Sequence, residues 1–93
     1  MYRLYLFVYD VVDDKRRTRV ARQLETVGER VQYSVFEVYL TKKELALEKD
    51  TLSEIIDPKE DSIRIYFLCQ GCKSKIITLG IGEVTSSPDV MII

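Results

Sequence analysis

Residues 2–9 constrain the fold most, because apolar side chains occupy nearly every position of this stretch. Aromatic and β-branched residues dominate it, which predicts a strand, and apolar groups on both faces predict a central position in a sheet. The run ends at a single carboxylate, Asp10. Because a lone carboxylate is costly to bury, we expect Asp10 to be partly exposed, paired with an arginine, or bound to a metal ion.

The segment after Asp10 predicts a helix with one apolar and one cationic face. Asp13 or Asp14 can cap its N-terminus, and Gly28 is expected to end it. The apolar stripe consists of Val20, Ala21, Leu24 and Val27. The cations are Lys15, Arg16, Arg17, Arg19 and Arg22. Cations in a first helical turn oppose the helix dipole, which favours a phosphate chain lying across them, although a solvated charged face is the alternative.

The rest of the chain predicts further strands and a second, more acidic helix. Residues 31–40 predict one strand by β propensity. Thr41 and Glu44 have the spacing of a capping box, and the pair Asp57-Pro58 is expected to stop the helix that follows. The buried side of this helix is predicted to contain Leu45, Leu52, Ile55 and Ile56. Residues 62–69 and 75–79 predict two more strands.

We interpret the order as β-α-β-β-α-β with a C-terminal tail, which is the ferredoxin-like arrangement of the α+β class. It has one four-stranded antiparallel sheet with two helices on one face. The 93 residues suffice for one domain, 1–93, with a core over 1–80 and a tail over 81–93. An apolar sheet face without helices indicates an interaction surface. We therefore expect a homodimer packed sheet to sheet, in which the apolar residues 90–93 add a strand to their own or the partner's sheet.

Composition excludes several kinds of chemistry. The chain has no histidine, so Ser-His-Asp and Cys-His devices and two-histidine metal sites are ruled out. Neither of the usual glycine-rich phosphate loops is present. Cys69 and Cys72 supply only two of the four ligands that zinc prefers. Four alternatives remain open for this pair: incidental cysteines, a local disulfide, a metal site shared across a dimer, or a redox function.

The chain shows no secretory signal and no apolar stretch near the length of a membrane span, so a cytoplasmic protein without a membrane partner is expected. Its net charge of −1 does not by itself indicate a nucleic-acid partner.

Asp10 is the candidate catalytic and metal-binding residue. One carboxylate is a weak magnesium site, but two brought together by a dimer axis fit Mg²⁺, which keeps most of its waters. Such an ion can activate water for attack on a phosphodiester. The alternative is that Asp10 only begins the turn into the helix.

Five aromatic residues could stack on unpaired bases: Tyr5, Tyr9, Tyr33, Phe36 and Tyr39. We expect Tyr5, Tyr33 and Tyr39 to pack in the core instead. Contact with nucleic acid is the stronger expectation for Tyr9 and Phe36, because they neighbour the strand ends.

The sequence resembles the family of the small CRISPR-associated adaptation protein, CRISPR-associated protein two, often described as an endoribonuclease. The resemblance runs over nearly the whole chain. Its strongest part is VYDVVDDKRRTRVARQLETVGERVQYSVFEVYL, residues 8–40. Further matching segments are Ile56-Asp57-Pro58, the stretch from Asp61 to Tyr66, and the apolar tail after Pro88. Val38 departs from the pattern, because the family often has a small residue near this position.

The resemblance implies a ferredoxin-like homodimer in which Asp10 of each chain meets its mate and binds Mg²⁺ or another divalent cation. It also implies roles in substrate binding or in shaping the site for Tyr9, Arg17, Arg19, Arg30, Ser34 and Phe36, and the charge pattern adds Arg16 as a nucleic-acid contact. The implied activity is metal-dependent cleavage of single-stranded RNA or duplex DNA.

The implied cellular role is spacer acquisition together with the larger CRISPR-associated protein one. Two alternatives remain open. One is a non-catalytic dimer that scaffolds the adaptation integrase. The other is a toxin-like ribonuclease or a small-ligand module, because ferredoxin-like domains host both.

Overall fold

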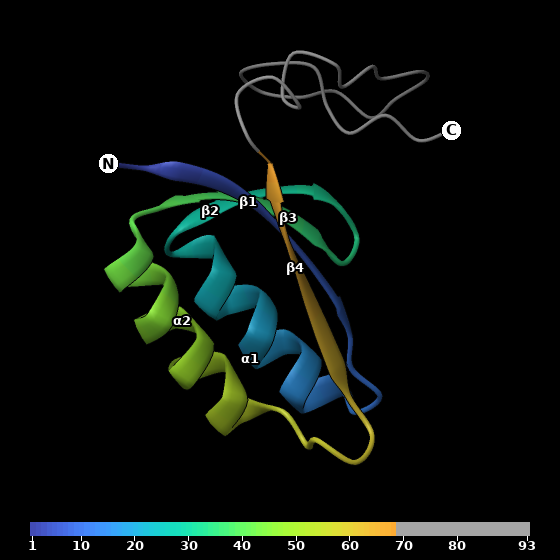
Figure 1. Ribbon diagram of the computed structural model, residues 1–93. Helices are drawn as coiled ribbons and strands as arrows, with labels where there is room; N and C mark the ends of the chain where they lie inside the picture. The colour runs from blue at the N-terminus through green and yellow to red at the C-terminus, as the bar shows by residue number, and fades with distance from the viewer. Residues whose placement is uncertain (69–93) are drawn as a thin grey trace.

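The computed structural model describes residues 1–68 (Figure 1), so the predicted strand 75–79, the pair Cys69 and Cys72, and the tail 90–93 lie outside the described residues. The elements are β1 (Arg3–Asp10), α1 (Asp14–Glu25), β2 (Gly28–Gln32), β3 (Val35–Leu40), α2 (Lys42–Ile55) and β4 (Ser62–Leu68). The predicted order β-α-β-β-α-β and the ferredoxin-like fold are confirmed.

The described strands form one antiparallel sheet in the order β2-β3-β1-β4. Strand β1 pairs on both sides: Phe7 lies opposite Phe36 of β3 and Ile65 of β4. Both helices lie side by side on the same face of the sheet (Figure 1). The predicted central position of the first strand is confirmed, so Asp10 ends a strand that is held from both edges.

The prediction of a single strand over residues 31–40 is wrong. The chain turns at Tyr33 and Ser34, and β2 folds back on β3 with a bulge between Arg30 and Gln32. No glycine, proline, asparagine or aspartate marks this turn, and strand-forming residues flank it on both sides. The missed turn supplies the second of the two consecutive strands in the fold.

The expected role of Gly28 at the helix end is also wrong. Helix α1 ends at Glu25 with Thr26 as its C-terminal cap, and Gly28 begins β2 opposite Val38. A Cβ at this position would lie 2.6 Å from Val38 Cγ2 and closer still to the Glu37 carbonyl oxygen. Glycine is therefore required by the close approach of two strands.

We expect Gly28→Ala to lower the free energy of unfolding by about 2 kcal/mol, because the added methyl group presses on the backbone of β3. Urea unfolding followed by circular dichroism measures the loss. Glu29→Ala, at an exposed position of the same strand, is the control. Equal unfolding midpoints for the two variants would show that the strands are not in such close contact.

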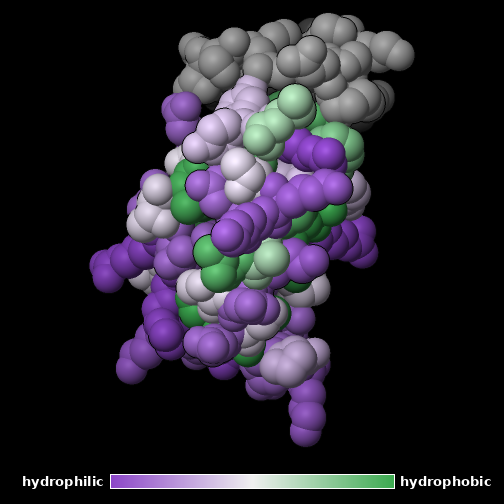
Figure 2. Space-filling model, turned by 60° about the vertical axis from the view of Figure 1, so that its left-hand side comes forward, coloured by the Kyte–Doolittle hydropathy of each residue, from purple (hydrophilic) through white to green (hydrophobic). Residues whose placement is uncertain are grey.

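The core lies between the sheet and the helices. Its largest fully enclosed side chains are Phe7, Val20, Leu24, Phe36 and Val38. The caps agree with the sequence: Asp13 accepts a hydrogen bond from the Arg16 N–H at 2.9 Å, and Thr41 and Glu44 form the predicted capping box. The side of the molecule seen in Figure 2 is mostly hydrophilic, with scattered apolar patches.

The two helices also share a polar contact in their interface. Gln23 Nε2 of α1 donates to both carboxylate oxygens of Glu48, a buried residue of α2, at 3.1 and 3.2 Å. Burial raises the pKa of the Glu48 carboxyl above its ordinary value, against the opposing effect of the Gln23 hydrogen bond.

Within residues 1–68, neither helix has the length and apolar character that a membrane crossing requires.

Candidate functional site

Asp10 is exposed at the last position of β1, opposite Ser62 of β4. Tyr5, Phe7 and Tyr9 of the same strand belong to the core under the helices. Because successive side chains of a strand point to opposite faces, Asp10 lies on the other face of the sheet, with Leu6 and Val8. The carboxylate is thus presented by a rigid strand on the face that α1 and α2 do not cover.

A metal ion at Asp10 would need ligands beyond those that residues 1–68 of a single chain bring together. Among residues 1–68, no three acidic or cysteine side chains lie close enough together to hold a metal ion. A hard cation such as Mg²⁺ is satisfied by one or two carboxylates and several waters. The exposed Asp10 fits such an ion if a second copy of the chain supplies a second carboxylate.

Arg17 holds the segment that follows Asp10 from one side. Its Nε donates to the Val11 carbonyl oxygen at 3.0 Å, and its Nη2 donates to the Val12 carbonyl oxygen at 3.0 Å. Its Nη1 also forms an ion pair with Asp14, one turn away on the helix. Arg17 therefore fixes the path of the chain between β1 and α1.

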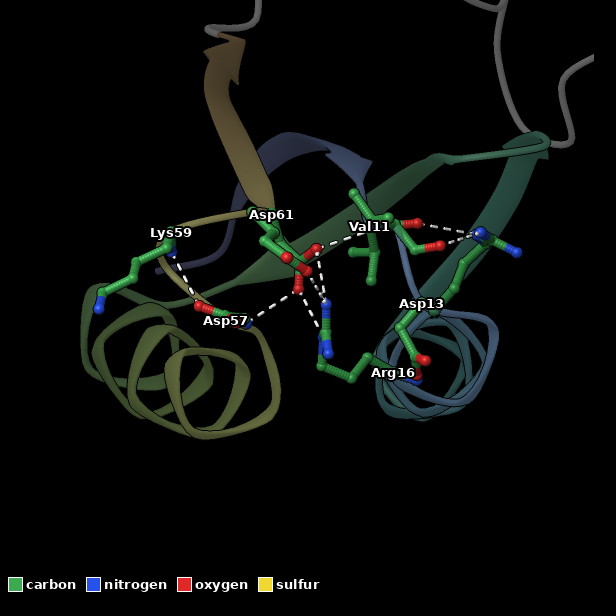
Figure 3. A network of polar contacts seen from close by, with 9 residues as sticks. Val11, Asp13, Arg16, Asp57, Lys59 and Asp61 are labelled. Atoms are coloured by element: carbon green, nitrogen blue, oxygen red, sulfur yellow. Dashed lines mark hydrogen bonds and ion pairs between the residues drawn. The ribbon is translucent and has the colours of Figure 1, made fainter.

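Asp61 holds the same segment from the other side. Its side chain is fully enclosed, and it accepts hydrogen bonds from the Val12 N–H at 3.0 Å and the Asp57 N–H at 2.8 Å. Arg16 Nε donates to it at 2.8 Å, and Figure 3 shows the two side chains pointing toward each other between the helices. One carboxylate thus joins the β1–α1 segment to the α2–β4 segment.

The charges of this pair stabilise each other. The hydrogen bonds from Arg16 and from the Asp57 and Val12 N–H groups hold the pKa of Asp61 well below its ordinary value, against the opposing effect of burial. The same carboxylate raises the pKa of Arg16. Glu60 adds an exposed ion pair to Arg16 at 3.2 Å. Arg16 and Arg17, the arginines in the first turn of α1, therefore have partners within the chain itself, which explains their position without a bound phosphate.

The remaining cations of α1 are placed differently. Arg19 and Arg22 are exposed and line an open groove between α1 and α2 that Thr51 and Glu54 also border. The structure thus divides the cationic run in two. Arg17 holds the backbone beside Asp10 and Arg16 pairs with Asp61, whereas Arg19 and Arg22 face the surface.

Tyr9, Phe36 and Arg30 form a stack near the β2–β3 turn. The rings of Tyr9 and Phe36 lie 6.2 Å apart, and the Arg30 guanidinium lies 5.2 Å from the Phe36 ring centre. Arg30 also forms an ion pair with Glu25 at 3.6 Å. Burial raises the pKa of Tyr9, whose hydroxyl donates to the Tyr33 carbonyl oxygen at 3.2 Å.

Exposure of the aromatic residues differs from the expectation at four of the five positions. Tyr9 and Phe36 are buried, so their rings are available for packing and not for stacking on a base. Tyr33, expected in the core, is 92% exposed, and Tyr39 is partly exposed. Only Tyr5 is buried as expected. Ser34 lies in the turn, where its carbonyl oxygen accepts from the Tyr9 N–H at 3.1 Å.

Sequence reasoning missed Asp61 as part of the site. No local pattern connects Asp61 with Arg16, which lies 45 residues earlier. Two features of the sequence could have indicated the pair. Asp61 is an acid directly before a predicted strand, and Arg16 is a cation in a first helical turn, where the helix dipole disfavours it.

Comparison with known proteins agrees with this geometry. The profile of the family described as "CRISPR associated protein Cas2" matches residues 1–76. A protein of Chloroflexus aurantiacus named as a CRISPR-associated endoribonuclease Cas2 is 48% identical over 80 residues, which are 86% of each chain. The crystal structure of Streptococcus pyogenes Cas2 is 40% identical with a TM-score of 0.76, over 83% of this chain and 99% of that one. A chain of a structure described as a partial Cas6-RT-Cas1–Cas2 complex is 33% identical with a TM-score of 0.73, over 83% and 90%.

Proposed function

Because the chain belongs to the Cas2 family of CRISPR-associated proteins, we propose that it is a CRISPR-associated endonuclease with Asp10 as its catalytic carboxylate. Its reaction is hydrolysis of phosphodiester bonds in single-stranded RNA or duplex DNA, in the service of spacer acquisition for antiviral defence. Relatives named as endoribonucleases support the reaction. The observation that carries the proposal is the exposed Asp10 at the end of a central strand, on the sheet face opposite the helices.

The proposal includes a symmetric homodimer built on that sheet face. Leu6 and Val8 share the face with Asp10 by strand alternation, and the partly exposed Tyr66 lies opposite Leu6. Apolar and aromatic side chains on an exposed sheet face are typical of an interface. In the proposed dimer two such faces pack together and the two copies of Asp10 lie near the dimer axis.

Magnesium or another divalent cation belongs to the proposed dimer. The two carboxylates would hold it, and the chemistry that it supplies when bound is activation of a water and neutralisation of charge on the phosphate. The chain's own contribution is the position of Asp10, which the Arg17 and Asp61 contacts to Val11 and Val12 restrain. Arg19 and Arg30, both exposed, are the proposed phosphate contacts.

Metal removal tests this proposal. The purified protein is incubated with end-labelled single-stranded RNA and with duplex DNA, in magnesium and in excess chelator. We expect cleavage of at least one substrate in magnesium and background levels in chelator, with recovery when magnesium is restored. Circular dichroism in both buffers checks that the chelator leaves the fold intact.

The same experiment distinguishes the second candidate function, a non-catalytic dimer that scaffolds the integrase containing CRISPR-associated protein one. The likeness to a chain of a Cas1–Cas2 complex favours this candidate. A protein that binds duplex DNA and cleaves neither substrate, with or without magnesium, would support scaffolding and contradict the nuclease. Cleavage that persists in chelator would contradict the role of the metal.

A further inference from the structure

The tip of the β2–β3 hairpin presents a tyrosine to solvent. Tyr33 is 92% exposed and stands in the two-residue turn with Ser34. Turns at the surface usually contain small polar residues or glycine, which adopt the required conformations easily. An aromatic ring here adds nothing to the described core, so the fold itself does not account for it.

The backbone of this turn is tied to the strand that carries Asp10. The Tyr9 N–H donates to the Ser34 carbonyl oxygen at 3.1 Å, and the Tyr9 hydroxyl donates to the Tyr33 carbonyl oxygen at 3.2 Å. Tyr9 directly precedes Asp10. Two hydrogen bonds from one residue therefore hold the exposed ring of Tyr33 at the same end of the sheet as the exposed carboxylate.

One cationic side chain, that of Arg30, lies beside this turn. Arg30 precedes it on β2, is exposed, and has its guanidinium 5.2 Å from the Phe36 ring centre. Its ion pair with Glu25 at 3.6 Å lies at the surface, where such pairs are weak and readily exchanged for a phosphate. An aromatic ring with a cation nearby is the usual composition of a site for single-stranded nucleic acid.

We propose that Tyr33 stacks on an unpaired base of a single-stranded nucleic acid whose backbone passes Asp10. This inference rests on the proposed function and specifies its substrate as single-stranded. In a duplex both faces of each internal base are already covered by neighbouring bases, so a surface ring finds a partner only at an unpaired base or a strand end. The turn is held by the buried Tyr9, whose ring lies 6.2 Å from the buried ring of Phe36.

Binding measured without cleavage tests the proposal. Fluorescence anisotropy in excess chelator gives the Kd for a short single-stranded RNA, the single-stranded DNA of the same sequence, and a long blunt duplex in which internal base pairs far outnumber the ends. We expect Tyr33→Ala to weaken binding of the single-stranded RNA by roughly 10-fold. Tyr33→Phe, which keeps the ring, should stay close to the wild type, and the duplex should bind all variants alike.

Tyr2→Ala is the matched control, because Tyr2 is also exposed, at 64%, and lies near the opposite end of β1. It should bind like the wild type. A 2-aminopurine placed in the RNA supplies a spectroscopic signature, because stacking on Tyr33 quenches its emission and Tyr33→Ala should restore it. Gel filtration of each variant shows whether the oligomeric state is unchanged.

Several outcomes overturn the proposal. They are equal affinity of Tyr33→Ala and wild type for single strands, equal losses on single strands and duplex, and no binding of single strands by the wild type. If single-stranded DNA alone responds, the stacking role stands and RNA is not the substrate. A nuclease specific for duplex DNA that ignores Tyr33 would leave the proposed catalytic role of Asp10 intact, so the two hypotheses fail separately.

Discussion

Asp10→Asn is expected to reduce cleavage by more than about 100-fold while the protein remains folded. Loss of groups that merely orient a metal ligand costs roughly 10- to 100-fold, and the ligand itself should cost more. In a homodimer the substitution removes both carboxylates at once. Because Asp10 is exposed, asparagine fits its place without disturbing the core. Initial cleavage rates at saturating magnesium, with the melting temperature measured in parallel, give the effect.

A mixed dimer sharpens this test. Two differently tagged forms of the chain, one carrying Asp10→Asn, are refolded together and the heterodimer is isolated on both tags. If the carboxylates share one ion, a single substitution should remove most of the activity and raise the magnesium concentration needed for what remains. Half of the wild-type rate with an unchanged magnesium requirement would mean that each Asp10 acts alone. Full activity of the doubly substituted dimer would remove Asp10 from the mechanism.

Asp61→Ala is expected to lower the melting temperature at pH 7 by on the order of 10 °C. The substitution leaves the Val12 and Asp57 N–H groups and the Arg16 guanidinium without the acceptor that the native fold provides. Enclosed donors that lose their acceptor are destabilising, because water does not replace it. Differential scanning fluorimetry measures the shift.

Glu60→Ala is the matched control for Asp61→Ala. Glu60 also forms an ion pair with Arg16, but its side chain is exposed, and exposed pairs contribute little to stability. It should melt close to the wild type. Equal melting temperatures for both variants would mean that Asp61 does not hold the two segments together.

The Asp61 effect should also depend on pH. The folded state lowers the pKa of Asp61, so its stabilisation is complete above the pKa of the unfolded chain, near 4. It is lost as the pH falls from there toward the folded pKa. The difference in melting temperature between wild type and Asp61→Ala should therefore be constant from about pH 5 to 8 and shrink below about pH 4.

Local signals in the sequence predicted the elements that position Asp10. The apolar run of β1, the cap at Asp13 and the capping box at Thr41 each depend on residues within a few positions of one another. These signals gave a single strand between the two helices, so the order β-α-β-β-α-β did not follow from them alone. They did not reveal the turn at Tyr33 and Ser34, because one serine between strand-forming residues is a weak turn signal. Nor did they reveal the role of Gly28, which depends on the distance between two strand backbones.

The candidate site was predicted less completely than the fold. Asp10 was identified because a carboxylate at the end of an apolar strand is unusual in any context. The partners of Arg16 and Arg17 are backbone carbonyls and an acid far along the chain, which charge patterns do not indicate. We expected Tyr33 in the core and Phe36 in contact with nucleic acid, but Tyr33 is exposed and Phe36 is buried. The difference arises from the missed turn, which places Tyr33 at the tip of a hairpin and Phe36 in β3.

The link between Val12 and Asp61 has a consequence for the newly synthesised chain. Residues 1–12 leave the ribosome long before residue 61, yet the Val12 N–H finds its acceptor only on that later residue. The segment beside Asp10 therefore cannot form its native hydrogen bond until residue 61 has been synthesised. A nascent chain that ends before residue 61 contains Asp10 but lacks the contact that restrains the backbone next to it.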